Sequence, residues 1–444
     1  MIRLIQSRKR HHVFWEKLPD RPFDDEAVCD DHAVILVVDA NRSYQTHLGF
    51  GGGFTEAAAI MFDCAKNQET ALNAYFSLEG LGYTLGRTVI HSSDFSLQSR
   101  TYLKEGDTSL DSFSLQEDDA LIVPLIKRAW EKASGLWLLA SPWSPPAFMK
   151  TNQSMAYGGS LRHTHRVMWA EYLVRYLKAM QERGLEIAAI SIQNEPEAIQ
   201  TWESCHYTIA QERAMVEALY AALNQDKLST KIIIWDHNRD RVAHRALGVL
   251  NGTDDKVWGI GHHWYVCESS ENLSVVHDRY PNKHILFTEG CVEYSQKALN
   301  SGSQEENLWR HGEHYGRNII KDSLHYTEAF IDWNLYLDEQ GGPNHVGNYC
   351  EAPIMIHRAD GDLTYNPSYY YIGHFSRYIR PKAKRIHCTI SVNEHVYATS
   401  YQNDDGTIVI VVQNEGGIQS LQLFVNNEPL YLSLPDRSIT TLLI

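Results

Sequence analysis

Two glutamates in the sequence each follow an apolar run, at positions where a carboxylate could do chemistry. Residues 187–192 have the composition of a strand that is covered on both faces, and the tetrapeptide Gln-Asn-Glu-Pro follows directly. The proline cannot extend the hydrogen-bond ladder, so Glu195 is predicted at the carboxyl end of this strand. Residues 284–288 form a similar apolar run that ends at Glu289.

A pair of facing carboxyl groups is what glycoside hydrolysis requires. One carboxylic acid protonates the leaving oxygen, while the other carboxylate attacks the anomeric carbon or activates water. Taken alone, Asn-Glu-Pro is more readily a turn that only ends a strand. The second glutamate changes this balance, because two glutamates at the ends of two buried strands could face each other across one pocket.

The strands that would position these glutamates belong to a series of eight. Segments with helical periodicity lie between these strands. Residues 208–211 form a capping box, which predicts the start of one of these helices. The alternation predicts the α/β class and a (β/α)8 TIM barrel, in which chemistry is carried at the carboxyl ends of the strands. Glu195 and Glu289 then follow strands four and seven. The predicted barrel strands are residues 49–53, 85–90, 136–140, 187–193, 232–236, 258–264, 285–289 and 330–334.

The other predicted strands also end in polar and aromatic residues. Because the ends of parallel strands meet at one face of a barrel, so many coincidences favour a catalytic face over a set of unrelated turns. The clearest are Ser92–Ser96, Ser141–Pro145, Asp236-His237, His262–Tyr265 and Asp332–Asn334.

Both ends of the chain have a different character from the middle. The first 45 or so residues predict one or two strands, the clearest at residues 34–38. The segment after residue 386 contains several short strands, two of them joined by Asn403-Asp-Asp-Gly, a hairpin signal. We expect residues 1–45 and 385–444 to combine into a β-sandwich attached to a catalytic barrel of residues 46–384.

Composition limits the classes of partner and compartment. A formal charge of −15 without a basic stripe argues against nucleic acid and against an anionic membrane surface. No signal peptide or membrane-inserting segment is recognised, and the seven cysteines lack CxxC spacing and are expected to be reduced thiols. A cytoplasmic protein that meets small-molecule substrates is therefore expected, with no preference for any oligomeric state.

A series of motifs resembles glycoside hydrolase family 30, the group of the glucosylceramidases (acid β-glucosidases) and their bacterial relatives. The resemblance runs in order from about residue 48 to 380, and the terminal β-module fits it too. The motifs are Gly49-Phe-Gly-Gly, Ser93-Asp-Phe-Ser, Leu139-Ala-Ser-Pro-Trp-Ser-Pro, Lys150-Thr-Asn, Asn194-Glu-Pro, His263-Trp-Tyr, Thr288-Glu-Gly-Cys, Asp332-Trp-Asn-Leu, Gly341-Gly-Pro-Asn and Gly373-His-Phe-Ser.

The resemblance implies a retaining mechanism with assigned roles. Glu195 matches the general acid/base and Glu289 the nucleophile, and Asn194 is expected to hydrogen-bond the sugar 2-hydroxyl. Glu195 would begin protonated, with its pKa raised by the negative charge of Glu289. No cofactor and no metal ion are implied.

The same resemblance implies a sugar site. Arg87 would orient the carboxylates through charge-assisted hydrogen bonds. The residues expected to bind or border the substrate are Asp94, Trp143, His263, Tyr265, Trp333 and Asn348, with Trp202 as a platform for the aglycone.

Several alternatives stay open beside an exo-β-glucosidase. β-Xylosidase, β-fucosidase and β-1,6-glucanase activities are neighbouring possibilities within the family. The sequence does not separate such substrates, because a methylene-sized difference between two sugars changes their binding free energy in a pocket by only about 1–3 kcal/mol. A catalytically inactive carbohydrate-binding barrel would be expected to lack one of the two glutamates. A metal-dependent hydrolase would need a ligand cluster, which only His262, His263 and Asp236 approach.

Overall fold

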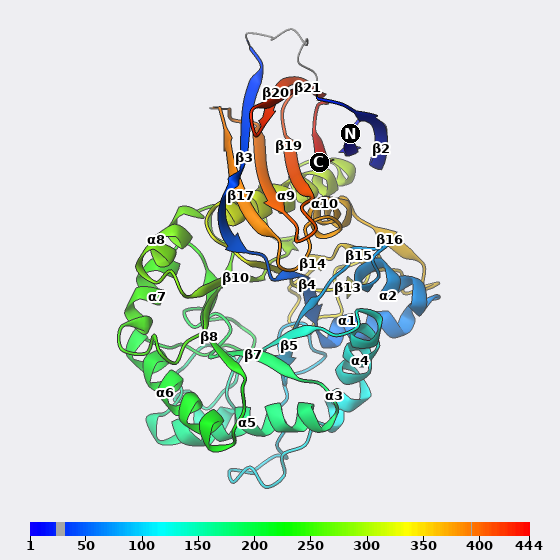
Figure 1. Ribbon diagram of the computed structural model, residues 1–444. Helices are drawn as coiled ribbons and strands as arrows, with labels where there is room; N and C mark the ends of the chain where they lie inside the picture. Colours follow the sequence, from blue (N-terminus) through cyan, green and yellow to red (C-terminus); the bar gives the residue numbers. More distant parts are fainter. Residues whose placement is uncertain (24–31, 392) are drawn as a thin grey trace.

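A closed barrel of eight parallel strands forms the lower part of the molecule in the computed structural model, and a nine-stranded sheet stands above it (Figure 1). The structure describes residues 1–23, 32–391 and 393–444. Neighbouring strands follow the order β10-β12-β4-β5-β6-β7-β8-β9 around the barrel. The predicted (β/α)8 barrel is confirmed.

Each barrel strand lies within a few residues of a predicted one. Glu289 is the last residue of β10, whereas Glu195 lies in the loop beyond β7. The barrel strands are β4 (Gly49–Phe54), β5 (Leu85–Ile90), β6 (Trp137–Pro142), β7 (Ile187–Ser191), β8 (Lys231–Asn238), β9 (Gly259–His263), β10 (His284–Glu289) and β12 (Ala329–Asp332).

Helices surround the barrel on its outer face (Figure 1). The capping box expected at Thr208 is present at the start of α6, where the side chain and backbone of Thr208 and Gln211 bond reciprocally. The helices are α1 (Glu56–Cys64), α2 (Gln68–Phe76), α3 (Gln116–Ala120), α4 (Ile122–Lys132), α5 (Arg166–Glu182), α6 (Ile209–Gln225), α7 (Val242–Leu250), α8 (Glu271–Arg279), α9 (Gln304–Leu324) and α10 (Pro367–Ser376).

Apolar side chains fill the barrel interior, so it is a packed core and not a channel. Leu85, Leu139, Ile233 and Leu286 belong to this interior cluster and are at most 2% exposed. Strand β4 needs glycine for close packing: a Cβ atom on Gly53 would lie 1.7 Å from the carbonyl oxygen of Trp333. The absence of a side chain there lets the segment after β12 approach the barrel wall.

Strands from both ends of the chain form the nine-stranded sheet, in the order β2-β1-β22-β19-β18-β17-β3-β20-β21. Their inward side chains enclose a second hydrophobic core. The amino-terminal segment supplies three strands where one or two were expected. The sheet strands are β1 (Ile2–Arg8), β2 (Val13–Arg21), β3 (Val34–Thr46), β17 (Lys384–Ile390), β18 (Val396–Gln402), β19 (Ile408–Asn414), β20 (Gln419–Val425), β21 (Glu428–Leu434) and β22 (Ser438–Leu443).

The domain boundaries expected at residues 45 and 385 fall at the ends of two of these strands, β3 and β17, each of which extends one residue across the boundary. Short strands lie in the loops that follow β10 and β12. They are β11 (Val292–Glu293), β13 (Tyr336–Leu337), β14 (Cys350–Glu351), β15 (Ile354–Ile356) and β16 (Leu363–Tyr365). Two 3-10 turns, Ala147–Met149 and His163–His165, lie between β6 and α5.

Helices α9 and α10 lie between the barrel and the sheet. The buried His374 on α10 joins the two, since its Nδ1 lies 2.9 Å from Thr441 Oγ1 and its Nε2 2.8 Å from Ser7 Oγ. Gln413 of β19 donates to the carbonyl oxygen of Glu313 on α9 at 2.9 Å. Polar bonds therefore anchor both ends of the chain to the barrel.

Two expectations concern the chain as a whole. Within the described ranges, no helix has the length and apolarity that crossing a bilayer requires. The six described cysteines are free thiols, and the seventh, Cys29, lies outside the described residues.

Acid should weaken the fold through its buried histidines. Burial lowers the pKa of His374 from its ordinary value of 6.5 to about 3. The stability that its neutral form contributes is complete above pH 6.5 and is lost as the pH falls toward 3, because only the unfolded chain takes up the proton. The loss from this one residue is about 2 kcal/mol at pH 5.

Urea unfolding of the wild type and His374→Gln at pH 7 and pH 5 tests this expectation. The variant should be less stable at pH 7, because it lacks the bonds to Ser7 and Thr441, and should lose less stability on acidification. His163→Gln, at an exposed position, is the matched control and should behave as the wild type. Equal acid sensitivity of wild type and His374→Gln would contradict the role given to His374.

Candidate active site

A cavity opens at the carboxyl ends of the barrel strands, and its space, counted together with the adjoining open solvent, is about 670 Å³. Nine of the eleven residues predicted for the site line it, while Arg87 and His263 lie beneath it with fully buried side chains. The nine are Asp94, Trp143, Asn194, Glu195, Trp202, Tyr265, Glu289, Trp333 and Asn348.

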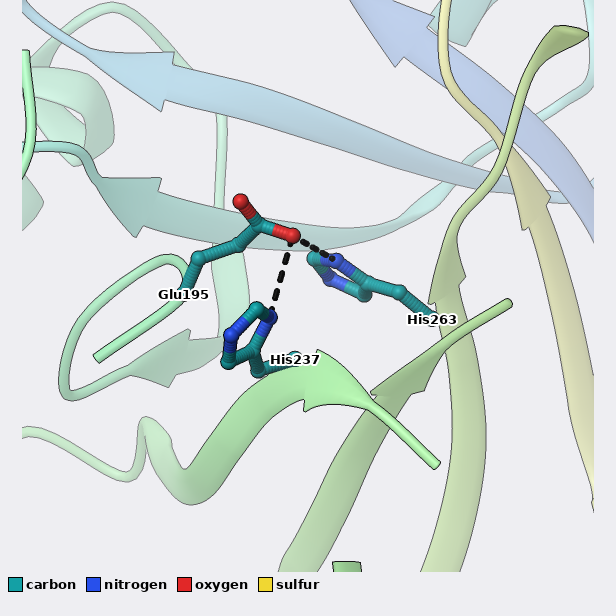
Figure 2. Close-up of side chains that lie close together, drawn as sticks. All are labelled: Glu195, His237 and His263. Atoms are coloured by element: carbon teal, nitrogen blue, oxygen red, sulfur yellow. Dashed lines mark hydrogen bonds and ion pairs between the residues drawn. The ribbon is translucent and has the colours of Figure 1, made fainter. Parts of the chain in front are cut away.

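Glu195 is held in the loop beyond β7 by backbone bonds. Its backbone conformation is left-handed, with φ of 49°, and its N–H donates to the carbonyl oxygen of Asp236 at 2.9 Å. One carboxylate oxygen, Oε1, lies 3.0 Å from His237 Nδ1 and 3.3 Å from His263 Nδ1 (Figure 2). Two imidazoles therefore share one oxygen of the predicted acid/base.

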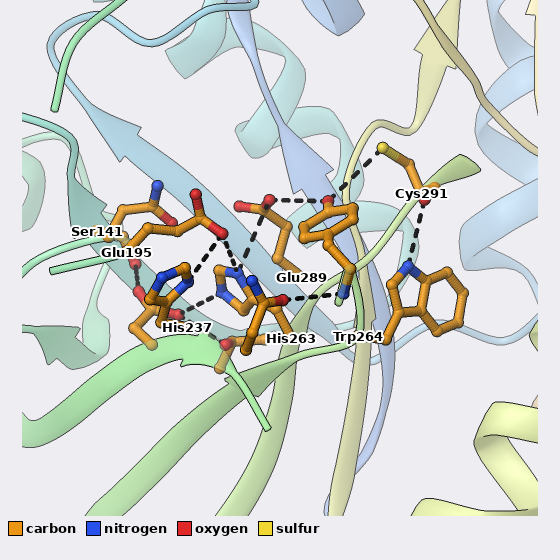
Figure 3. Close-up of polar contacts among 12 residues, drawn as sticks. Ser141, Glu195, His237, His263, Trp264, Glu289 and Cys291 are labelled. Carbon is orange, nitrogen blue, oxygen red and sulfur yellow. Dashed lines mark hydrogen bonds and ion pairs between the residues drawn. The ribbon is translucent and has the colours of Figure 1, made fainter. Parts of the chain in front are cut away.

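Glu289 is fixed through both of its oxygens. Oε2 accepts from Arg87 Nη1 at 2.5 Å, and Oε1 accepts from the hydroxyl of Tyr265 at 2.8 Å. The same Oε1 lies 4.0 Å from His263 Nδ1 (Figure 3). Glu195 and Glu289 thus border the same nitrogen atom, which places both carboxylates beside a common space.

Arg87 on β5 connects the strand ends around the site. Nη2 donates to Asn194 Oδ1 at 2.8 Å and to Asp236 Oδ2 at 2.9 Å, and Nε donates to Ser141 Oγ at 3.1 Å. With its bond to Glu289, the guanidinium contacts residues at the ends of four other strands. A guanidinium is suited to this because its donors form a rigid fork.

The pKa pattern differs from the expectation for Glu195. Burial favours its neutral form, but the contacts with His237 and His263 outweigh burial and lower the pKa of Glu195 well below its usual range. Burial lowers the pKa of His263, whereas Glu289, Asp236 and Glu195 raise it to about 9 overall. The two histidines therefore shift the pKa of Glu195 in the direction opposite to the expected rise, and the same contacts favour the protonated form of His263.

His237 is a site residue that the sequence reasoning did not select. It directly follows Asp236, and in a regular strand successive side chains point to opposite faces. Here the register with β9 shifts between Trp235 and His237, and Trp235 and Asp236 have φ values of 69° and 50°. This bulge turns both Asp236 and His237 toward the site. Only the adjacency of two polar residues at a strand end signalled it.

Four of the residues predicted to bind the sugar lie together in the cavity. Trp143 and Trp333 are stacked, with ring centroids 5.0 Å apart and planes at 15°, and each is 2% exposed. Asp94 accepts a hydrogen bond from Asn348 Nδ2 at 3.1 Å. Burial, with the nearby charge of Glu289, raises the pKa of Asp94 to about 8. Trp202 is partly buried, closer to the mouth.

The histidines do not form the metal cluster that was considered from the sequence. His262 Nε2 lies 3.0 Å from Thr327 Oγ1, on the far side of the strand from the site. The ligand atoms that do converge belong to Glu195, His237 and His263, and all lie within 4.8 Å of one another. These three residues are the ones that could hold a cation.

Two family models match the chain, and the division between them lies close to the junction of the barrel with the carboxyl-terminal strands of the sheet. Residues 47–379 match the glycosyl hydrolase family 30 TIM-barrel domain, and residues 382–442 match the family 30 β-sandwich domain. The chain is 30% identical to the lysosomal acid glucosylceramidase of Mus musculus, over 91% of this chain and 80% of that protein. It is 28% identical to an endo-1,6-β-D-glucanase of Neurospora crassa, over 84% and 79%.

A solved structure, SrfJ from Salmonella typhimurium, superposes with a TM-score of 0.92 at 34% identity and covers 100% of this chain and 99% of that one. The barrel and the sheet therefore agree with the sequence matches. The chain belongs to glycosyl hydrolase family 30 and is a glycoside hydrolase.

Proposed function

We propose that this hydrolase is a retaining exo-β-glucosidase, which releases a terminal β-linked glucose from small or glucosylceramide-like β-glucosides through a covalent glycosyl-enzyme. One observation carries the proposal: Glu289 is bonded through both oxygens, and Glu195 reaches the same His263 nitrogen from the other side. A carboxylate held this firmly is suited to attack, and the one shared by two imidazoles to exchange protons.

In this mechanism Glu289 attacks the anomeric carbon while the leaving oxygen takes a proton from Glu195. His263 Nδ1 lies 3.3 Å from Glu195 Oε1, so a proton can pass from His263 to Glu195 as Glu289 loses the charge that favours protonated His263. Once the glycosyl-enzyme has formed, Glu195 takes a proton from water, which attacks the anomeric carbon and releases Glu289. Asn194, oriented by Arg87, faces the sugar 2-hydroxyl.

The closed floor of the cavity supports exo-action. Trp143, Trp333 and Asp94 are almost fully buried there, and the Asp94–Asn348 hydrogen bond links two loops across the end of the cavity. A chain-cleaving enzyme needs an open path on both sides of the scissile bond. The similarity to the mouse glucosylceramidase supports glucose as the sugar.

The aglycone would lie toward the mouth of the cavity. Trp202 lines this side, and Ile199, in the same loop, is 69% exposed. Such a rim suits an apolar aglycone as well as a second sugar. We propose that the enzyme acts in the cytoplasm, since the exposed thiols of Cys64 and Cys267 would stay reduced there.

A β-1,6-glucanase is the second candidate, and the similarity to the Neurospora crassa enzyme favours it. The two functions differ in their first products. An exo-enzyme acting on a β-1,6-glucan releases only glucose at early times, and an endo-enzyme releases a ladder of oligosaccharides. Chromatography of the early products should show glucose alone; oligosaccharides at less than one per cent conversion would replace our proposal by the glucanase.

The roles of the two glutamates are tested by their glutamine variants. Glu289→Gln should abolish turnover. Glu195→Gln should lower kcat/KM by about 10²–10⁴-fold for substrates with poor leaving groups, which need an acid. With a good leaving group, azide should restore turnover of Glu195→Ala, but not of Glu289→Gln, and yield a β-glycosyl azide, because the small anion reaches the space of the removed carboxylate.

Glu197→Gln is the matched control, because this residue lies two positions from Glu195 and pairs with Arg241 and Arg245 outside the cavity. It should leave kcat/KM nearly unchanged. An active Glu289→Gln enzyme, or an α-glycosyl azide product, would show that the nucleophile is assigned wrongly.

The sugar is tested with p-nitrophenyl β-glycosides of glucose, xylose, fucose and galactose. We expect the highest kcat/KM for the glucoside, by roughly 10-fold or more over the xyloside, which lacks one CH2OH group. A faster xyloside or fucoside would keep the mechanism and change the substrate. No turnover of any of the four would count against exo-action.

A further inference from the structure

Three potential metal-ligand atoms converge at the acid/base of the site. They are Glu195 Oε1, His237 Nδ1 and His263 Nδ1, which all lie within 4.8 Å of one another (Figure 2). Across the part of the chain that the structure describes, no other three His, Cys, Asp or Glu residues are grouped in this way. The mechanism of glycoside hydrolysis does not need this arrangement, since it uses no metal ion.

The distances from Glu195 to the two imidazole nitrogens are close to those in a zinc site. Bond lengths of 2.0–2.2 Å in a tetrahedron place neighbouring ligand atoms about 3.3–3.6 Å apart. The carboxylate oxygen of Glu195 lies 3.0 Å from His237 Nδ1 and 3.3 Å from His263 Nδ1. Two histidines and one glutamate form a well-known zinc ligand set, with the fourth position left open.

The residues behind the ligands hold them in place. His263 Nε2 lies 3.1 Å from Asp236 Oδ1, so Nδ1 is the nitrogen left facing Glu195. Asp236 is itself fixed by Thr288, at 2.6 Å, and by Arg87. A carboxylate behind a ligating histidine is the usual support in metal sites. His237 is aimed by the bulge in β8, and its ring packs against Trp235 at 5.0 Å.

An ion could reach this position from the cavity. The side chains of Glu195 and His237 are 14% and 12% exposed, and both line the cavity, whereas His263 forms the buried side. The fourth coordination position would therefore face the space that the leaving group of a substrate occupies.

We propose that Glu195, His237 and His263 form an inhibitory site for a divalent transition-metal ion of the Zn²⁺ type. The bound ion is coordinated by the unprotonated nitrogen and carboxylate oxygen atoms, and any proton that they hold is released to solvent. Glu195, as a ligand, can then neither protonate the leaving oxygen nor take a proton from water. Hard cations such as Mg²⁺, which prefer oxygen ligands, should not act in this way.

Binding is tested without substrate, by calorimetry with Zn²⁺ and by the visible spectrum of Co²⁺. The wild type should bind one ion tightly and give the intense absorption of four-coordinate Co²⁺. His237→Asn should bind at least tenfold more weakly and lose the absorption. His237→Asp should retain binding, because aspartate has nearly the same shape as asparagine but supplies a carboxylate oxygen as a ligand. His163→Asn, which changes an exposed histidine, is the matched control and should bind as the wild type.

The same series tests inhibition, with each variant's rate compared with its own rate in EDTA. The Zn²⁺ concentration that halves the rate should rise at least tenfold in His237→Asn and stay unchanged in His163→Asn. Unchanged Zn²⁺ binding in His237→Asn would overturn the proposal, as would loss of binding in Cys267→Ser, which would assign the ion to an exposed thiol. Since binding is measured without substrate, these outcomes are independent of which glycoside the enzyme hydrolyses.

Discussion

A fully buried arginine is the constraint on which the active face of this barrel depends. The guanidinium of Arg87 is inaccessible to water, and a charge in that position is tolerated only where carboxylates and hydrogen-bond acceptors surround it. Asp236 and Glu289 supply the opposite charge, and Asn194 and Ser141 accept the remaining hydrogens. The hydrogen bonds of Arg87 hold Glu289 and also join the ends of the barrel strands. The geometry of the proposed catalytic pair is therefore coupled to the closure of the barrel.

The backbone beside this network departs from regular strand geometry. Glu195, Trp235 and Asp236 all adopt left-handed conformations, which cost non-glycine residues of order 1–3 kcal/mol each. The cost is offset from outside the barrel, where buried Glu212 on α6 accepts the Trp235 N–H at 2.8 Å and pairs with Arg245 at 2.7 Å. The helical layer thus helps to hold the bulge that directs Asp236 and His237 inward.

The barrel could be predicted from the sequence because its strands are short apolar runs with polar ends. The apolar run marks each strand, and the polar end marks the face of the sheet at which chemistry is expected. It failed where local rules were broken. His237 could not be assigned, since strand alternation points it away from Asp236. The low pKa of Glu195 depends on the two imidazoles and could not be anticipated without them. Strand β2 was missed because it is half-exposed and contains a proline, as edge strands do.

The pairing of β1 with β22 joins residues 3–8 to residues 438–443. During synthesis on the ribosome, the first of these strands emerges long before the second exists, so β1 has an unpaired edge until nearly the whole chain has been made. Such sequence-distant pairing slows folding and exposes strand edges to other chains. Chaperone dependence and the yield of folded protein on expression should therefore depend mainly on how the sheet assembles, whereas the catalytic chemistry depends on the barrel.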